Sequence, residues 1–504
     1  MTRLAVVLTS GAAMLLPVAA QAADLPGRKS APVEYVRVCD AYGAGFYWIP
    51  GTDTCLKIGG RVRVDSWYTP AKNAVQMRSA GGPAYAGPPG GGNASATFVS
   101  ANAVDSIGWY ARAILTMDAR TQSAWGTVQT AMTLRFAAQS GLAQTAPYLG
   151  YASGLFANAG TNAPTFIEAA YIRFAGFTIG QAATNFQFLT VFPLHTPWFG
   201  SFPGGTRQIA YTASFGSGLS ATLALENRGD MPQSGTAGAL GFNPWSATAA
   251  TATGNGPQRL PAVVANVRLD QSWGAAMVSG AVLENTANFA TPAVQATTGG
   301  TGPMMRKTGW AVGAGLRVNL PMIAAGDHFQ GWISYGVGAL DYVAFTGINS
   351  NLGFTASYLG GFLRADRNMT IYCPSAGCTR PGAEQTGAFN IAGIFTHYWT
   401  PSLRSHFFAS LVRLTPGTVT RNTDWTNGGL STVTSWSTQG SLIWSPVRNF
   451  DLGVELSYAR LSQRLAGFAG GAPTAVPCAP ASPMCLANIS PGNWTVRMRA
   501  ERVF

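Results

Sequence analysis

Apolar and polar residues alternate along much of this chain, most clearly over residues 208–215 and 219–226. Apolar side chains occupy the odd-numbered positions of both stretches, and polar side chains occupy most of the even-numbered positions. A period of two is the spacing at which side chains recur on one face of a β-strand. The glycine-containing link 216–218 joins the two stretches, so we predict an antiparallel hairpin here.

Charged residues follow the same alternation in the first clear strand, 56–68, and in the last, 493–504. The polar faces of these stretches carry Lys57, Arg61, Arg63 and Asp65 in the first and Thr495, Arg497, Arg499 and Glu501 in the last. The opposite faces are apolar, apart from Arg502 near the end of the chain. A row of charges is costly in a dry protein core, whereas a water-filled lumen accommodates it.

Sixteen stretches fit this pattern, and long and short connections alternate between them. The predicted strands are 56–68, 106–119, 124–137, 166–175, 177–183, 208–215, 219–228, 260–269, 271–284, 308–320, 329–343, 389–399, 402–414, 433–444, 450–461 and 493–504. An even number of strands with short periplasmic turns and long extracellular loops is typical of outer-membrane barrels. A further strand-like segment, 353–364, would break this parity, so we place it inside a long loop.

Composition supports a barrel that crosses a membrane. Only 10% of the residues are charged, against about 25% in ordinary soluble domains. Beyond the N-terminus no apolar run approaches the roughly 20 residues of a spanning helix. Because lipid offers no hydrogen-bond partners, every strand must be paired and no edge can remain. We therefore predict an all-β fold, a 16-stranded antiparallel transmembrane β-barrel in which 493–504 closes against 56–68.

The region before the barrel divides into two parts. Residues 1–22 have a basic start, an apolar stretch and the small-residue sequence Ala20-Gln21-Ala22, which together predict a secretory signal peptide. Residues 23–55, rich in proline and glycine, are predicted to form a periplasmic N-terminal segment, and 56–504 the barrel.

The six cysteines form three close pairs. They are Cys39 with Cys55, Cys373 with Cys378, and Cys478 with Cys485. Close, even-numbered cysteines in an exported protein predict disulfides. The alternative is a metal site built from the last two pairs, but it would require two distant loops to meet. We expect no metal and no cofactor.

The chain is basic, with a formal net charge of +12. Lysines and arginines are dispersed singly along the predicted strands, which argues against nucleic acid as a partner. The four histidines are scattered and no motif of a hydrolase or phosphate-binding enzyme is present, so we predict a protein that is not an enzyme; a barrel lipase or protease is the minor alternative.

The predicted lumen-facing basic residues are the candidates for a functional site. They are Lys57, Arg61, Arg63, Arg112, Arg135, Arg173, Arg497 and Arg499. A ring of like charge attracts counter-ions, so these residues predict a pore that favours anions. The alternative is that some of them only solvate a wide wall.

Several motifs resemble those of alphaproteobacterial general porins. They are the segments 33–46 and 49–58 near the N-terminus, 174–181, Trp444-Ser445-Pro446-Val447, and the terminal Phe504. The resemblance implies a homotrimer in the outer membrane, in contact with lipid and lipopolysaccharide, that passes small hydrophilic solutes by passive diffusion. It also implies that Phe504 is an assembly signal and that the loop after the fifth strand, 185–206, folds into the lumen as a constriction loop.

This loop departs from the porin pattern, because it holds six aromatic residues and neither aspartate nor glutamate. The favoured interpretation is that its aromatic rings pack against the barrel wall. In the alternative, residues such as Phe188, His195 and Trp198 line the narrowest point and stack against sugars, which gives a sugar-selective channel. A further alternative is a structural barrel that links the membrane to peptidoglycan through residues 23–55.

Overall fold

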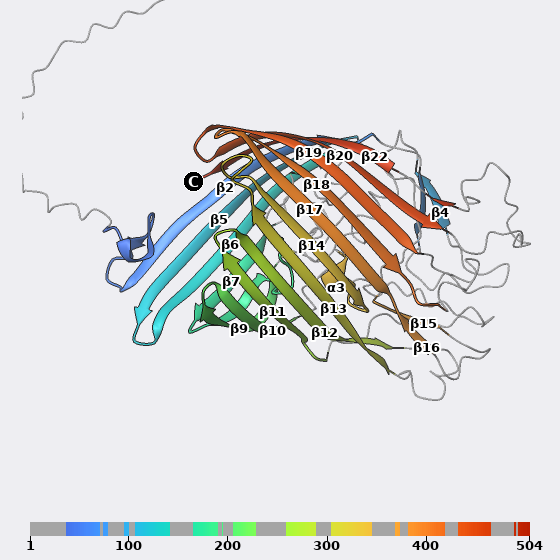
Figure 1. Ribbon diagram of the computed structural model, residues 1–504, viewed down its shortest axis with the longest axis horizontal. Coiled ribbons are helices and arrows are strands. Elements are labelled where there is room, and N and C mark those ends of the chain that lie inside the picture. The colour runs from blue at the N-terminus through green and yellow to red at the C-terminus, as the bar shows by residue number, and fades with distance from the viewer. Residues whose placement is uncertain are drawn as a thin grey trace, which may run out of the picture.

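Sixteen long antiparallel strands close into one barrel in the part of the chain that the structure describes (Figure 1). The computed structural model describes residues 37–70, 74–78, 95–99, 106–141, 165–189, 194, 205–227, 259–288, 304–344, 368–372, 382–418, 432–464, 488–489 and 492–504. No helix within these ranges is long and apolar enough to cross a membrane.

The barrel strands follow one another around the wall in chain order. Their bounds are β2 Thr54–Tyr68, β5 Ile107–Ser123, β6 Gly126–Gly141, β7 Thr165–Phe174, β8 Phe177–Ala183, β9 Gly205–Gly216, β10 Leu219–Glu226, β11 Ala262–Gln271, β12 Gly274–Asn288, β13 Met304–Asn319, β14 His328–Val337, β17 Gly387–Thr400, β18 Leu403–Thr415, β19 Val433–Val447, β20 Phe450–Arg464 and β22 Gly492–Val503. Every predicted strand has its counterpart, so the predicted strand number and order are confirmed.

The last strand closes the barrel against the first, as predicted. β22 pairs with β2 in an antiparallel register that runs from Arg61 opposite Val503 to Tyr68 opposite Val496. At the end of this ladder Phe504 N–H donates to the Gly60 carbonyl, and Gly60 N–H donates to the Phe504 carbonyl, each at 3.0 Å. No unpaired edge therefore remains at the seam between the two ends of the chain.

The alternation of the sequence sorts side chains between the two faces of the wall. On β2, Val62 and Val64 are exposed on the outer face, while Arg61, Arg63 and Asp65 belong to the inner face. The outer row is apolar as lipid requires, and the inner row carries the charge.

The prediction for 329–343 is wrong at its C-terminal end. β14 stops at Val337, and Leu340–Val343 form a short helix, α3, which is buried. Gly338 adopts a φ of +62°, which favours glycine and turns the chain out of the strand direction. Its carbonyl accepts a hydrogen bond from Asn285 Nδ2 at 2.7 Å, which holds the turn.

The boundary between β5 and β6 also differs from the prediction. β5 extends to Ser123 and β6 begins at Gly126, so the turn lies at residues 124–125 rather than at 120–123. Ser123 Oγ donates to the Gly126 carbonyl at 2.7 Å and closes this turn.

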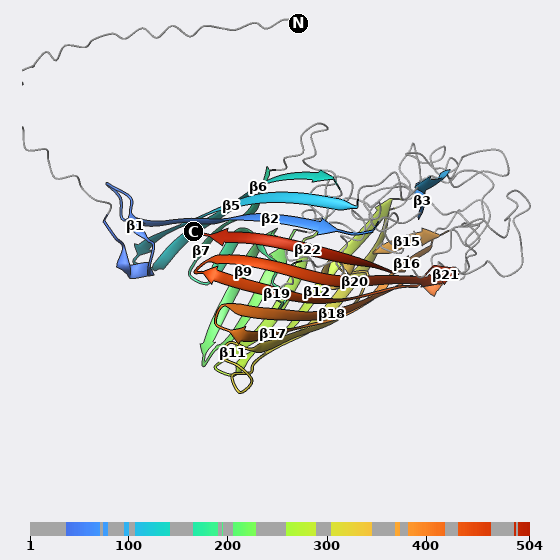
Figure 2. The ribbon, with the colours of Figure 1, turned by 90° about the horizontal axis from the view of Figure 1, so that it is seen from above.

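The N-terminal segment lies beside the start of β2, at the end of the barrel that carries the short turns (Figure 2). It contains the 3-10 helix η1, Asp40–Tyr42, and the strand β1, Tyr47–Trp48, which pairs with β2. The predicted Cys39–Cys55 disulfide is confirmed, with Cα atoms 6.0 Å apart. It ties the segment to the first barrel strand. The predicted signal peptide and the other four cysteines lie outside the described residues.

Short strands accompany the long-loop end of the barrel. They are β3 Ala74–Arg78 with β4 Ser95–Val99, β15 Met369–Tyr372 with β16 Gly382–Gln385, and β21 Asn488–Ile489 beside β20. The segment 353–364 lies outside the described residues.

The inner faces of β10–β14 and β17–β19 hold a continuous apolar cluster. It buries alanine, valine and isoleucine side chains of these strands together with Leu340 and Tyr342 of α3 and Phe186 and Phe188 of the loop after β8. The inner faces of β22, β2, β5 and β6 carry charged side chains instead. We call the part of the interior that holds this cluster the apolar side, although buried polar side chains such as Gln330 and Asn390 lie on the same strands. The part at β22, β2, β5 and β6 is the charged side.

Candidate functional site

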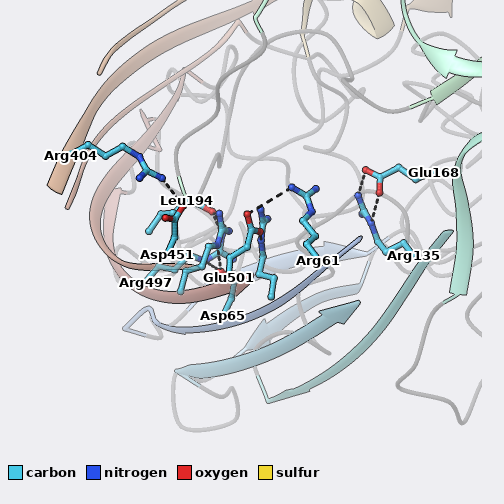
Figure 3. A network of polar contacts seen from close by, with 11 residues as sticks. Arg61, Asp65, Arg135, Glu168, Leu194, Arg404, Asp451, Arg497 and Glu501 are labelled. Atoms are coloured by element: carbon cyan, nitrogen blue, oxygen red, sulfur yellow. Dashed lines mark hydrogen bonds and ion pairs between the residues drawn. The ribbon is translucent and has the colours of Figure 1, made fainter. Parts of the chain in front are cut away.

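The charged side of the interior is built from alternate residues of four adjacent strands. We call its six basic residues the arginine wall: Arg61 and Arg63 on β2, Arg112 on β5, Arg135 on β6, and Arg497 and Arg499 on β22. Side chains two residues apart on a strand share a face, and Figure 3 shows those drawn there reaching into the interior. The structure thus brings together six of the eight predicted basic residues.

Strand register places the wall residues in rows. One row runs across Glu501, Arg63, Arg112 and Ala137, which are direct partners on β22, β2, β5 and β6. The next row contains Arg61, Ile114 and Arg135. Directly opposite residues on paired strands have Cβ atoms about 5 Å apart, so the basic groups of the two rows lie close together.

Carboxylates interleave with the arginines. Glu501 forms an ion pair with Arg63 and lies 3.9 Å from Arg61. Glu168 of β7 accepts a hydrogen bond from Arg135 Nε at 3.1 Å (Figure 3). These acids belong to the barrel wall and not to the constriction loop, which agrees with the absence of Asp and Glu from residues 185–206.

Asp65 is the third carboxylate and serves the β22 arginines. It accepts a hydrogen bond from Arg499 Nε at 2.6 Å and lies 4.0 Å from Arg497 Nε. The guanidinium of Arg497 also lies over the ring of Trp67, 4.9 Å from its centroid. Both arginines are thereby held in fixed orientations.

These two arginines hold one residue of the constriction loop, which spans 184–204 because β9 begins at Gly205. The carbonyl of Leu194 accepts hydrogen bonds from Arg497 and, at 2.7 Å, from Arg499 Nη2. The N–H of Leu194 donates to Glu455 of β20 at 2.7 Å. We call this arrangement the Leu194 clamp; it fixes the loop to the charged side of the interior (Figure 3).

The start of the same loop is held by a buried carboxylate on the apolar side. Glu226, at the end of β10, accepts hydrogen bonds from Thr184 Oγ1 and Asn185 N–H, both at 2.8 Å, and from the Tyr342 hydroxyl at 3.2 Å. Asn266 Nδ2 donates to the Asn185 carbonyl at 2.7 Å. Glu226 therefore joins the loop to α3, two segments far apart in sequence.

Two aromatic residues that follow, Phe186 and Phe188, pack against the wall. Phe186 meets Trp332 of β14 edge to face with ring centroids 5.6 Å apart, and it contacts Tyr342 at 5.2 Å. Phe188 is buried over Gly315 of β13, where a Cβ would overlap its ring. The position of Phe188 corresponds to the interpretation in which the loop packs on the wall, not to a stacking track for sugars.

The remaining predicted site residues lie elsewhere. Lys57 Nζ donates to the Ala44 carbonyl at 3.1 Å and faces the N-terminal segment. Arg173 is exposed near the short turn after β7, with its guanidinium 4.6 Å from the Tyr171 ring centroid. Lys57 and Arg173 therefore lie apart from the arginine wall, near the short-turn ends of their strands. His195 and Trp198 lie outside the described residues.

Sequence reasoning missed the acidic partners of the loop, Glu226 and Glu455. Both lie on the inner faces of predicted strands, so strand alternation marks them as interior acids. Their role depends on hydrogen bonds from loop backbone N–H groups, which no sequence pattern reveals. Among the described residues no group of three or more His, Cys, Asp or Glu side chains is placed to hold a metal ion.

Comparison with known proteins assigns this barrel and its charged interior to a family. A family model described as a porin subfamily matches residues 25–477. The chain belongs to this porin subfamily.

Curated relatives give the same family. Porin Omp2b of Brucella suis biovar 1 (strain 1330) is 32% identical over 231 residues, which cover 44% of this porin and 53% of the relative. Porin Omp2b of Brucella abortus (strain 2308) matches with the same figures. The match thus spans about half the length of these relatives. The resemblance to alphaproteobacterial general porins is confirmed.

A solved structure supports the fold. The outer membrane channel DcaP of Acinetobacter baumannii aligns over 91% of this porin and 99% of its own chain, with a TM-score of 0.53 and 15% sequence identity. At this identity the likeness concerns the barrel fold alone.

Proposed function

We propose that this porin forms a water-filled channel for passive diffusion of small hydrophilic solutes and ions, with a preference for anions. The observation that carries the proposal is the charge balance of the arginine wall. Six arginines share that side of the interior with four carboxylates, namely Asp65, Glu168, Glu455 and Glu501, which leaves an excess of two positive charges.

The division of the interior supports a path along the charged side. Loop and α3 side chains bury the apolar side in one packed cluster. On the charged side the Arg61 side chain is 35% exposed and that of Glu168 is 27% exposed, so solvent reaches these groups. Ions that cross the barrel along this side pass close to the arginines.

Coulomb's law gives the size of the expected preference. Two charges about 8 Å from a passing ion, in a medium with the dielectric constant of water, act on it with roughly 1 kcal/mol before screening. This energy corresponds to an enrichment of anions by about fivefold and a similar depletion of cations. Screening weakens the effect strongly as the Debye length falls from about 30 Å at 0.01 M salt to about 3 Å at 1 M.

The test is the reversal potential of the purified porin in planar bilayers under a potassium chloride gradient. We expect a clear chloride preference near 0.01 M salt and almost none near 1 M. A cation preference at low salt would overturn the proposed selectivity, and the absence of ohmic channel conductance would overturn the proposed channel.

We further propose a homotrimer surrounded by lipid and lipopolysaccharide. The family and the apolar outer row of strands such as β2 support this assembly. Native mass spectrometry in detergent is expected to give three chains per particle, and a monomer at the same protein concentration would contradict it.

A further inference from the structure

Arg112 differs from the other residues of the arginine wall in its partners. Acids bind or flank the other five: Glu501 contacts Arg61 and Arg63, Glu168 binds Arg135, and Asp65 binds or flanks the two arginines of β22. For Arg112 the described residues supply an aromatic neighbour, Tyr110, whose ring centroid lies 5.9 Å from the guanidinium carbon. They supply no carboxylate bound to it.

The burial of Arg112 makes this arrangement costly. Arg112 is 6% exposed, and its Nε has no hydrogen-bond acceptor within the described part of the chain. A buried cation needs both counter-charge and hydrogen-bond acceptors to offset its lost hydration. Arg63, Arg135 and Arg61 all act on it with positive charge.

The strand register defines the residues beside Arg112. Arg63 is its direct partner on β2, and Ala137 is its direct partner on β6. Ala137 presents only a methyl group next to the long side chain of Arg112. Arg61 and Arg135 lie one row away, on the two neighbouring strands.

We propose that Arg112, with Arg61, Arg63 and Arg135 around it, forms a binding site for a small polyvalent oxyanion inside the channel. The guanidinium fork matches the paired oxygens of a phosphate or a carboxylate. Such an anion supplies the acceptors that Arg112 Nε lacks and the negative charge that the four arginines share. This inference rests on the proposed channel function and adds to it a discrete, saturable site.

The experiment measures block of chloride current through the purified porin in planar bilayers. Inorganic phosphate and malonate are the probes, added separately at constant ionic strength. We expect each anion to reduce the chloride conductance along a saturating curve. Arg112→Gln is expected to raise the half-blocking concentration about tenfold or more, because it removes a charge-assisted hydrogen bond worth about 1.5–3 kcal/mol.

Two further variants distinguish a discrete anion-binding site at Arg112 from a general effect of the positive charge of the channel. Arg112→Lys keeps the charge but loses the fork, so we expect weaker block with unchanged anion preference. Arg404→Gln is the matched control: it removes an interior arginine that binds Asp451 at 2.6 Å, and we expect it to change the half-blocking concentration by less than about twofold because solvent and salt screen distant charges.

The outcomes are distinguishable from those of the selectivity test. A non-saturating response in the wild type, or equal effects of Arg112→Gln and Arg404→Gln, would overturn the site while the chloride preference stands. If Arg112→Gln abolished the block by phosphate but left the block by malonate unchanged, this would also contradict a site that binds both anions through the guanidinium fork. Heat-modifiable migration on gels checks that each variant is a folded barrel.

Discussion

The Leu194 clamp predicts that the constriction loop can be loosened without changing the charge of the channel. The perturbation is the double substitution Arg499→Met with Asp65→Asn. It removes the hydrogen bond from Arg499 to the Leu194 carbonyl and the ion pair that orients Arg499. Because one positive and one negative charge disappear together, the net charge of the interior is unchanged.

The structure sets the size of the expected change in the ratio of released to clamped loop. Three charge-assisted hydrogen bonds hold Leu194, two at its carbonyl and one at its N–H. Each contributes about 1.5–3 kcal/mol. Loss of one of them raises the ratio of released to clamped loop by about 10- to 100-fold, since each 1.4 kcal/mol corresponds to a factor of about ten.

Single-channel recording at constant voltage is the assay. We expect the wild type to hold a steady current and the double variant to show many more brief steps away from the main level. The matched control is Arg404→Met with Asp451→Asn, which removes a comparable interior arginine–aspartate pair, 2.6 Å apart, that makes no hydrogen bond to Leu194. A current as steady as that of the wild type, or equal unsteadiness in the control, would refute the clamp.

Two other expectations follow from the structure. Gly315→Ala would place a Cβ into the ring of Phe188, so we expect overpacking of about 1–3 kcal/mol and an altered unit conductance. Gly440→Ala, which meets nothing within 4 Å, serves as its control, and equal conductance in the two variants would contradict the contact. Deletion of Phe504 removes two hydrogen bonds to Gly60, each of which contributes about 0.5–1.5 kcal/mol. We expect the amount of assembled barrel to fall more than the conductance of each assembled pore. A normal amount of the truncated protein in the membrane would contradict this expectation.

The fold was predictable because lipid imposes a simple rule on every strand. Outward residues must be apolar and inward residues can be polar, so the period of two appears in sixteen separate stretches. The rule fails where the chain leaves the wall. Leu340, Tyr342 and Val343 are apolar and follow β14 closely. Residues 340–343 nevertheless form α3, because Gly338 turns the chain out of the strand direction and these three side chains pack in the apolar cluster.

The site was predictable only in part. Alternation assigns Arg61, Arg63, Arg112 and Arg499 to inner faces, but it does not say which of them are neighbours. That depends on strand register, which the hydrophobic pattern and turn geometry set over the whole barrel. The Leu194 clamp could not be predicted from the sequence, because Leu194 forms its hydrogen bonds through its backbone and its side chain carries no sign of them.

The seam of the barrel and its charged wall are the same place. Asp65 with Arg499 and Arg63 with Glu501 join β2 to β22, residues more than 400 positions apart in sequence. None of these pairs exists until the last strand meets the first. The same closure brings β22 to the Leu194 clamp. A barrel that stays open at this seam therefore lacks both its balanced charge and its fixed constriction loop, so assembly and conduction depend on the same contacts.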